Sequence, residues 1–178
     1  KEIPFSGPGD FEGITLNGNT AYIVRSDAVI FEVDMISGKT REYNTHFTAG
    51  KNVESIFYQA GKNRLLIAAK EPDRDDANLK GIFAFDLQTK NAKAQPVTVI
   101  NLDNELLDSK GGGKKKKKFM PSAIAVHPLN NDLYILDGPK SRLMVADSNG
   151  KIKQVYDLGK EFYKPEGISF GPGGDLYI

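Results

Sequence analysis

Apolar residues recur at every second position in short runs along the chain, and clusters of Gly, Asn, Asp and Pro separate these runs. A period of two is typical of β-strands, whose side chains point alternately to the two faces of a sheet. The one short exception is a predicted helical turn at Asn104 to Leu107. The pattern therefore predicts an all-β fold.

One strand pattern occurs four times, as a polar residue, a small residue, Ile, and an apolar residue two positions later. The leading polar residues are Glu12, Glu54, Ser122 and Glu166, which lie 42, 68 and 44 residues apart. Each copy is followed by hairpin-forming residues and a second strand, at 21–24, 65–68, 133–136 and 176–178. Third strands ending on Asp34, Asp86 and Asp147 and more polar fourth strands near 41–43, 97–100 and 154–158 complete the first three units.

Four-stranded units of about 40 to 45 residues are typical of β-propeller blades. We expect one propeller domain over residues 1–178, with blades starting near 10, 52, 120 and 164 and polar insertion loops at 72–80 and 103–118. The chain would then cover about three and a half blades of a larger ring, with further strands outside it. The alternative is a β-sandwich with regular hairpins, but a sandwich does not usually repeat one motif at the same place in each unit.

The composition adds few constraints on function. The 178 residues include 24 basic, 23 acidic and no cysteine side chains, which excludes disulfides, thiolate metal sites and cysteine nucleophiles. Six of the lysines belong to one low-complexity run, Lys110 and Lys114 to Lys118, so the rest of the chain is acidic, with 18 basic and 23 acidic residues. This run is a solvated loop or a contact for polyanions.

Propeller geometry predicts where polar side chains gather. The innermost strand of each blade starts at one face near the axis, and the second strand returns to that face, so Glu12, Glu54, Ser122 and Glu166 should surround the mouth of the channel. The ends of the second strands add further candidates to this face: Arg25, Asp27, Lys70, Glu71 and Asp137.

Two interpretations of the glutamates stay open. Converging carboxylates repel unless a cation balances them, and oxygen ligands favour Ca²⁺ or Mg²⁺, so Glu12, Glu54 and Glu166 are candidate ligands of a divalent ion. Alternatively, each glutamate accepts backbone hydrogen bonds or pairs with Arg25 or Lys70 and so fixes the packing of the blades.

Other polar residues are predicted to have structural roles. His127 precedes Pro128 in a turn on the opposite face, and His46 has no acid or serine motif beside it. The aspartates Asp34, Asp86 and Asp147 are expected to cap turns, and Asp73 to Asp76 to form a solvated loop. The chain lacks a Gly-x-Ser-x-Gly motif, which argues against a serine hydrolase.

The segments Asp10 to Thr15 and Lys164 to Ser169, with Gly173 to Ile178, resemble the SdiA-regulated family of bacterial β-propellers, which includes YjiK-like proteins. Pro121 to Ile135 is similar to the NHL repeat. The resemblance implies a ring of about six blades that is exported to the periplasm or held at the cell envelope as a lipoprotein, and the family has no general catalytic activity to carry over to this chain. Related lactonase propellers hold a divalent ion at the channel mouth.

These observations favour an exported binding or scaffold module whose partner is an envelope protein or a glycan, with Ca²⁺ as the candidate cation. Enzymatic activity stays open, with absence favoured. The alternative is a metal-dependent hydrolase of lactones or esters, in which an ion on Glu12, Glu54 and Glu166 polarises a carbonyl and Asp137 is the base. We expect no transmembrane segment and no nucleic acid partner.

Overall fold

The computed structural model of the chain describes residues 2–45, 52–70, 76–107 and 119–178. Its strands form antiparallel sheets in chain order, which we call blades one to four. Blade one contains β1 (Phe11–Asn17), β2 (Thr20–Arg25), β3 (Val29–Asp34) and β4 (Thr40–Asn44). Blade two contains β5 (Val53–Gln59), β6 (Arg64–Ala69), β7 (Leu79–Asp86), β8 (Asn91–Ala92) and β9 (Thr98–Asn101).

Blade three contains β10 (Pro121–Val126), β11 (Leu133–Asp137), β12 (Arg142–Ala146) and β13 (Ile152–Asp157). Blade four is a hairpin of β14 (Ser169–Phe170) and β15 (Leu176–Tyr177). Short 3-10 turns are η1 (Ala60–Lys62), η2 (Glu105–Leu107), η3 (Gly138–Lys140) and η4 (Lys160–Phe162). The predicted helical turn at Asn104 to Leu107 thus corresponds to η2.

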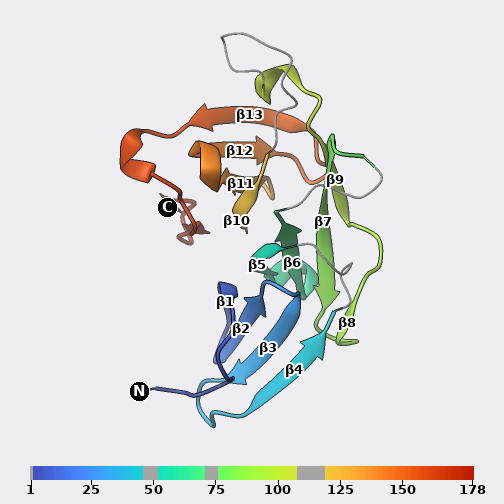
Figure 1. The fold of residues 1–178 in the computed structure, drawn as a ribbon, viewed down its shortest axis with the longest axis vertical. Coiled ribbons are helices and arrows are strands. Elements are labelled where there is room, and N and C mark those ends of the chain that lie inside the picture. The colour runs from blue at the N-terminus through green and yellow to red at the C-terminus, as the bar shows by residue number, and fades with distance from the viewer. Residues whose placement is uncertain (1, 46–51, 71–75, 108–118) are drawn as a thin grey trace.

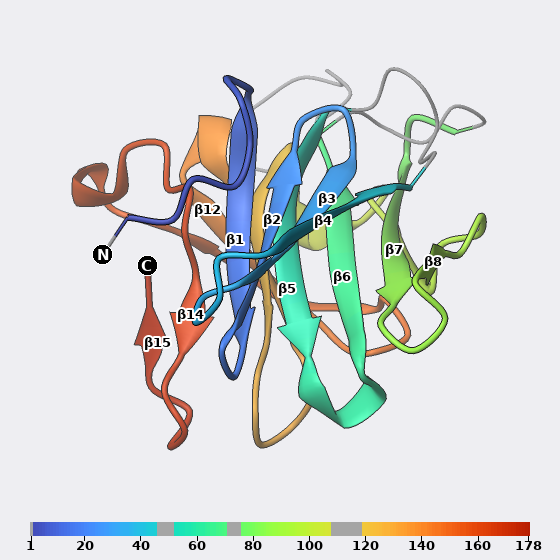
Figure 2. The same ribbon diagram turned by 90° about the horizontal axis from the view of Figure 1, so that it is seen from below.

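The blades follow one another along an open arc, with the N-terminal blade at one end and the β14–β15 hairpin at the other (Figure 1). The first strand of each blade lies on the inside, so that β1 contacts β5, β5 contacts β10, and β10 contacts β14. Figure 2 shows β1 and β5 running lengthwise on this inner side. This arrangement of four-stranded sheets confirms the all-β propeller fold that the repeat predicts.

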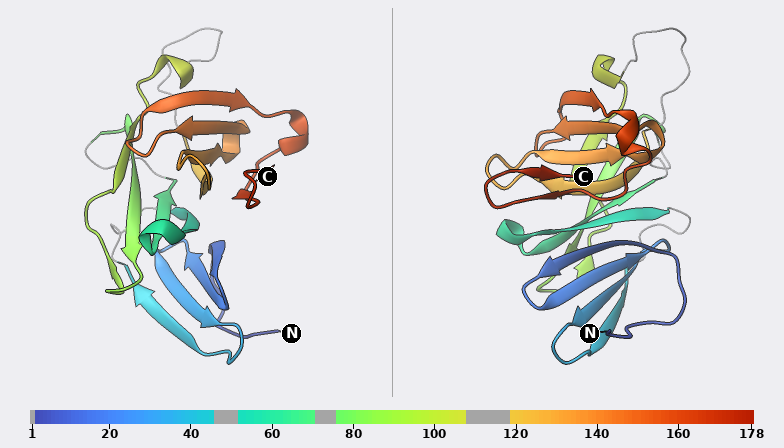
Figure 3. Two further views of the ribbon diagram at one scale, coloured as in Figure 1. Left: turned by 180° about the vertical axis from the view of Figure 1, so that it is seen from behind. Right: turned by 90° about the vertical axis from the view of Figure 1, so that its left-hand side faces the viewer.

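Apolar side chains fill the spaces between consecutive blades. One core cluster, which includes Tyr22, Ile30 and Phe85, joins blades one and two. Another, which includes Leu66, Ile82 and Ile135, joins blades two and three. Figure 3 shows the blades stacked one on another along the arc. Because both faces of a middle blade are covered, its strands are apolar on both sides, as in β6, where five consecutive residues are buried.

Polar contacts reinforce the packing between blades. Lys90, in the turn after β7, forms an ion pair with Glu32 on β3, with 2.6 Å between Nζ and Oε2. The hydroxyl of Tyr43 donates to the same Glu32 oxygen at 3.0 Å. Burial raises the pKa of the neighbouring Tyr22 to about 12, and the charge of Glu32 adds to this. The Thr98 hydroxyl donates to the carbonyl of Ser148 at 3.1 Å and so links blades two and three.

The turn aspartates behave as the sequence predicts. The Oδ1 atom of Asp34 accepts the N–H groups of Ile36 and Ser37 at 2.8 and 2.9 Å. Asp86 accepts two N–H groups in the same way, and these bonds, first that from Thr89, lower the pKa of its carboxyl. Asp147 accepts the N–H groups of Asn149 and Lys151. One turn chemistry therefore closes the third strand of each of the first three blades.

Blade two differs from the predicted pattern at its outer edge. Strand β7 begins at Leu79, inside the range predicted as loop 72–80, because Leu79 and Lys80 pair with Asn101 and Ile100 of β9. The outer strand is also divided into β8 and β9, both of which pair with β7. Of the other predicted loop, 103–118, the structure describes only 103–107, which includes η2.

Candidate functional site

The leading polar residues of the first three repeats occupy equivalent irregularities of the backbone. In each inner strand the register shifts by one residue, between Phe11 and Gly13, between Val53 and Ser55, and between Pro121 and Ala123. The extra residues of these β-bulges are Glu12, Glu54 and Ser122. A bulge bends the strand and redirects the side chain of its extra residue, which is why bulges are frequent beside functional sites. We call the edge that carries these three residues the bulge edge.

Two carboxylates come close together at the bulge edge of blades one and two. Burial raises the pKa of Glu12, and the negative charges of Glu54 and Asp10 raise it further. A hydrogen bond with the Asp10 side chain acts in the same direction, while the positive charge of Lys70 lowers the pKa. Glu12 is therefore held where a negative charge is unfavourable and an additional positive charge would stabilise it.

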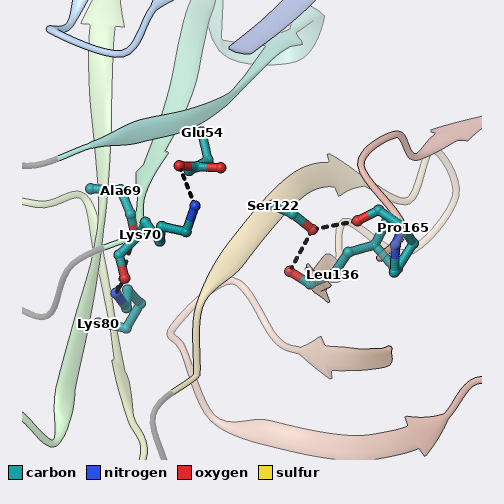
Figure 4. A network of polar contacts seen from close by, with 7 residues as sticks. All are labelled: Glu54, Ala69, Lys70, Lys80, Ser122, Leu136 and Pro165. Carbon is teal, nitrogen blue, oxygen red and sulfur yellow. Dashed lines mark hydrogen bonds and ion pairs between the residues drawn. The ribbon is translucent and has the colours of Figure 1, made fainter. Parts of the chain in front are cut away.

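Glu54 has a cationic partner within its own blade. The Nζ atom of Lys70 lies 2.9 Å from its Oε1 atom, and both side chains are partly exposed. At the same end of the sheet, the buried Nζ of Lys80 donates to the carbonyls of Ala69 and Lys70 at 3.1 and 2.9 Å (Figure 4). Lys80 thereby fixes the end of β6 and the residue that follows it, Lys70.

Arg25 and Asp27 form a separate pair on blade one. The Nε and Nη2 atoms of Arg25 donate to Oδ1 and Oδ2 of Asp27, each at 2.9 Å. The hydrogen bond from Arg25 lowers the pKa of the Asp27 carboxyl. The guanidinium also lies 5.4 Å from the centre of the Phe31 ring. Arg25 is therefore engaged with its own blade, and Lys70 is the predicted partner that forms an ion pair with one of the glutamates, Glu54.

Ser122 and Glu166 take different positions at the same edge. The buried Ser122 hydroxyl donates to the carbonyl of Pro165 at 2.7 Å, and this bond joins blade three to the segment before β14 (Figure 4). Glu166, the next residue, is exposed. Ser122 thus has a structural role between blades, while the side chain of Glu166 is open to solvent.

Asp137 is the most buried of the candidates, with a relative exposure of 0%. Its Oδ2 atom accepts from Arg142 Nη2 at 2.6 Å and from Nε at 3.2 Å, and its Oδ1 atom accepts the Met120 N–H at 3.4 Å. Both partners of the ion pair lie inside blade three. To act as a base, Asp137 would have to leave this pair, so the geometry favours a structural role.

The metal site stays a prediction. Within residues 2–45, 52–70, 76–107 and 119–178, no group of three or more His, Asp and Glu side chains is close enough to hold an ion. Glu12 and Glu54 could supply two carboxylates with the chemistry that Ca²⁺ prefers, but Glu166 does not complete a set of three with them. Glu71, His46, Asp73 to Asp75 and Lys114 to Lys118 lie outside the described residues, while Asp76 accepts the N–H of Asn78 in a local turn.

The opposite edge of the blades has a different character. His127 lies at the far end of β10, stacks on Tyr134, and contacts the edge of Phe170 with 4.8 Å between ring centres. Its Nδ1 atom accepts the Leu129 N–H at 3.3 Å. As predicted, His127 belongs to a turn, and it also helps to pack the β14–β15 hairpin on blade three.

Three site residues were not found by sequence reasoning. Asp10 stands two positions before Glu12, and two carboxylates separated by one residue at a strand start could have identified it. Arg142 lies five residues after Asp137 across a turn containing Gly and Pro, a spacing at which opposite charges on paired strands meet. Lys80 gave no signal, because its neighbours in the sequence are those of a polar loop.

In the part of the chain that the structure describes, no helix is long and apolar enough to cross a membrane.

Comparisons with known proteins support the fold and no more. No protein family model matches the chain, and no curated protein matches it. A solved protein of unknown function from Bacteroides caccae superposes with a TM-score of 0.59 and 10% identity, over 93% of this chain and 51% of that one. The WD40 repeats of RRP9 superpose with a TM-score of 0.54 and U3-55K with one of 0.53, each with 10% identity over 88% of this chain.

This chain spans 41% of the RRP9 structure and 42% of the U3-55K structure, so it corresponds to about half of the solved structures that it matches. At this identity the likeness extends to the fold alone. The repeat, the antiparallel sheets along an arc and the similarity to WD40 repeats agree that the chain has a β-propeller fold.

Proposed function

We propose that the chain is a non-catalytic binding or scaffold module that recognises cationic groups of a partner at its bulge edge. The observation that carries the proposal is the position of Glu12, the extra residue of the β-bulge of blade one, where the carboxylates of Glu54 and Asp10 repel its negative charge. A positive group placed there would relieve the repulsion between the carboxylates. The surrounding blades provide a framework in which neighbouring charges are already paired, as in Arg25–Asp27.

The candidate polar groups form structural contacts, and this favours a scaffold over a hydrolase. Asp137 is bonded to Arg142 and Ser122 to Pro165, so the residues that could supply a base or a nucleophile take part in the packing. The propeller fold is also used for binding through exposed edges and connections, where function is commonly found. An envelope protein or a glycan that carries amines remains the kind of partner that we propose.

A titration with hexalysine tests this proposal. We expect the peptide to bind the chain at low salt, hexaglutamate not to bind, and Glu12→Gln to weaken binding several-fold by calorimetry. Glu105→Gln, on the exposed turn η2, is the matched control, because it removes one negative charge away from the bulge edge. Equal losses in the two variants would show that net charge alone attracts the peptide and would contradict the proposal.

The cation belongs to the same proposal and has its own measurement. Ca²⁺ held between Glu12 and Glu54 would lower the pKa of Glu12 and compete with Lys70 for Glu54. Calorimetric titration with CaCl₂ should then show binding that Glu12→Gln weakens and Glu105→Gln does not. The absence of heat at millimolar Ca²⁺ would contradict the proposal that the ion binds, and it would not affect the proposal that amines bind.

The family and the location of the protein are further proposals that rest on the sequence resemblance. We infer that the intact protein is an exported member of the SdiA-regulated, YjiK-like propellers. Fractionation of cells that express it from its natural start codon should place it in the periplasm or the envelope. Recovery of the protein in the cytosol alone would contradict this inference.

A further inference from the structure

The turn after the third strand has an unusual residue in blade two. In each of the first three blades this turn contains a residue with a positive φ, directly before the residue that pairs back onto the aspartate of the third strand. The residue is Gly38 in blade one, Lys90 in blade two and Gly150 in blade three, with φ angles of 75°, 55° and 89°. A positive φ favours glycine, because a Cβ atom is strained there. A lysine at this position therefore indicates that its side chain has a role.

The side chain of Lys90 reaches from blade two to blade one. Its Nζ atom lies 2.6 Å from Oε2 of Glu32 and 5.9 and 5.5 Å from the ring centres of Tyr22 and Tyr43. Both rings are within the distance of about 6 Å at which an aromatic ring attracts a cation. The Tyr43 hydroxyl donates to the same Glu32 oxygen at 3.0 Å and so orients the carboxylate. We call Glu32, Tyr22 and Tyr43 the ammonium cage.

The ammonium cage lies inside the arc, at the interface between two blades. Tyr22 is 4% exposed, and the side chain of Glu32 is 17% exposed, so its charge needs a partner. The Lys90 side chain is 31% exposed, which leaves it accessible from solvent. The turn of blade three packs on blade two in another way, since a Cβ atom at Gly150 would collide with the carbonyl oxygen of Val99. The contact through an ammonium group thus distinguishes the interface of blades one and two from the next one.

We propose that the ammonium cage is a binding site for a primary ammonium group, that the amine of Lys90 occupies it, and that acylation of this amine releases blade one from blade two. In acylation by a thioester the amine nitrogen attacks the carbonyl carbon, the C–N bond forms and the C–S bond breaks. One proton leaves with the thiol and one passes to water. The amide is neutral, so it loses the ion pair with Glu32 and the attraction of both rings, and the carboxylate stays in the interface without its counterion. This proposal is independent of the proposed function, which concerns the bulge edge.

A pair of chemical adducts tests whether the cage requires a positive charge. The chain contains no cysteine of its own, so Lys90→Cys provides one thiol for alkylation. Bromoethylamine restores an ammonium group, and iodoacetamide adds a neutral amide of nearly the same length. We expect the ammonium adduct to unfold several degrees above the amide adduct in thermal unfolding. In the Lys90→Cys/Glu32→Gln background the two adducts should unfold at the same temperature. Equal unfolding temperatures with Glu32 in place would overturn the proposal.

Hydrogen exchange of the acetylated chain tests the release of blade one. Acetyl-lysine is placed genetically at position 90 of the 178-residue chain, and in the control at position 62, because Lys62 is exposed in η1 of the same blade. We expect the amides of β3 and β4 to exchange several-fold faster when Lys90 is acetylated and at the unmodified rate when Lys62 is acetylated. The same rates in both acetylated chains would overturn the proposal. An equal increase in all blades would also overturn it, because the modification would then destabilise the whole fold rather than release blade one.

Discussion

The bulges of blades two and three share a backbone geometry but use it differently. At the bulge of blade two, Glu54 pairs with Lys70 and both side chains remain partly exposed. At the bulge of blade three, Ser122 is buried against Pro165, and the adjoining Asp137 is buried against Arg142. The same β-bulge thus carries a partly exposed charged side chain in blade two and stabilises the packing of blade three against the next segment. The residue at the bulge and the neighbouring blade decide which of the two it does.

The largest expected effect concerns the buried pair of blade three. Asp137→Asn leaves the Arg142 guanidinium buried without its counterion, and the loss of one partner of such a pair costs about 3–5 kcal/mol of unfolding free energy. Asp27→Asn breaks the more exposed pair with Arg25 and should cost less than about 1 kcal/mol. Urea unfolding followed by circular dichroism measures both, and similar losses would contradict the contrast between buried and exposed charges.

The close contact between β1 and β5 has the next largest expected effect. In Gly13→Ala the new methyl group must displace the backbone of Ile56, so the unfolding free energy should fall by about 1–3 kcal/mol. The control is Gly61→Ala in η1, where a Cβ atom meets nothing within 4 Å and the change should stay within about 0.5 kcal/mol. A Gly13→Ala variant as stable as this control would show that the inner strands do not need a small residue.

Two serines on the inner strands allow a comparison in which the expected changes in unfolding free energy are smaller. Ser122→Ala removes a hydrogen bond of 2.7 Å and leaves the Pro165 carbonyl with one partner fewer, which should cost about 1 kcal/mol. The Ser55 hydroxyl is also buried, yet it has no hydrogen-bond partner among the residues that the structure describes, so Ser55→Ala should be neutral or stabilising. Thermal unfolding of both variants checks this order, and a greater loss in Ser55→Ala would reverse the interpretation.

The smallest expected effect is a dependence on pH at the bulge edge. Because the pKa of Glu12 is raised in the folded state, mainly by burial and by Glu54, the folded chain binds its proton more tightly than the unfolded chain. Ionisation of Glu12 therefore lowers stability as the pH rises from the ordinary pKa through the raised one. Glu12→Gln should remove this loss, so that its stability relative to the unsubstituted chain increases over that interval, by less than about 1 kcal/mol. A stability difference that does not change with pH would contradict the raised pKa.

The sequence predicted the fold well because a repeated alternation of apolar residues fixes strands, faces and turns locally. The turns closed by aspartates at the ends of the third strands followed from the same repeat. The burial of Asp137 did not follow from the repeat, because it depends on the ion pair with Arg142 across a turn. The contrast between Ile14, which is 64% exposed, and the equivalent Ile56, which is 6% exposed, was also beyond prediction, since equivalent residues differ in exposure only through the blade packed against them.

The most direct test of the account is an NMR titration of the chain with hexalysine, in which backbone amide shifts locate the binding surface. The account predicts saturable shifts at residues 10–13 and 53–55 and at Lys70, with no change around His127 and Tyr134 at the opposite edge. Shifts centred on the opposite edge, or spread evenly over all acidic side chains, would contradict the assignment of the bulge edge as the binding surface.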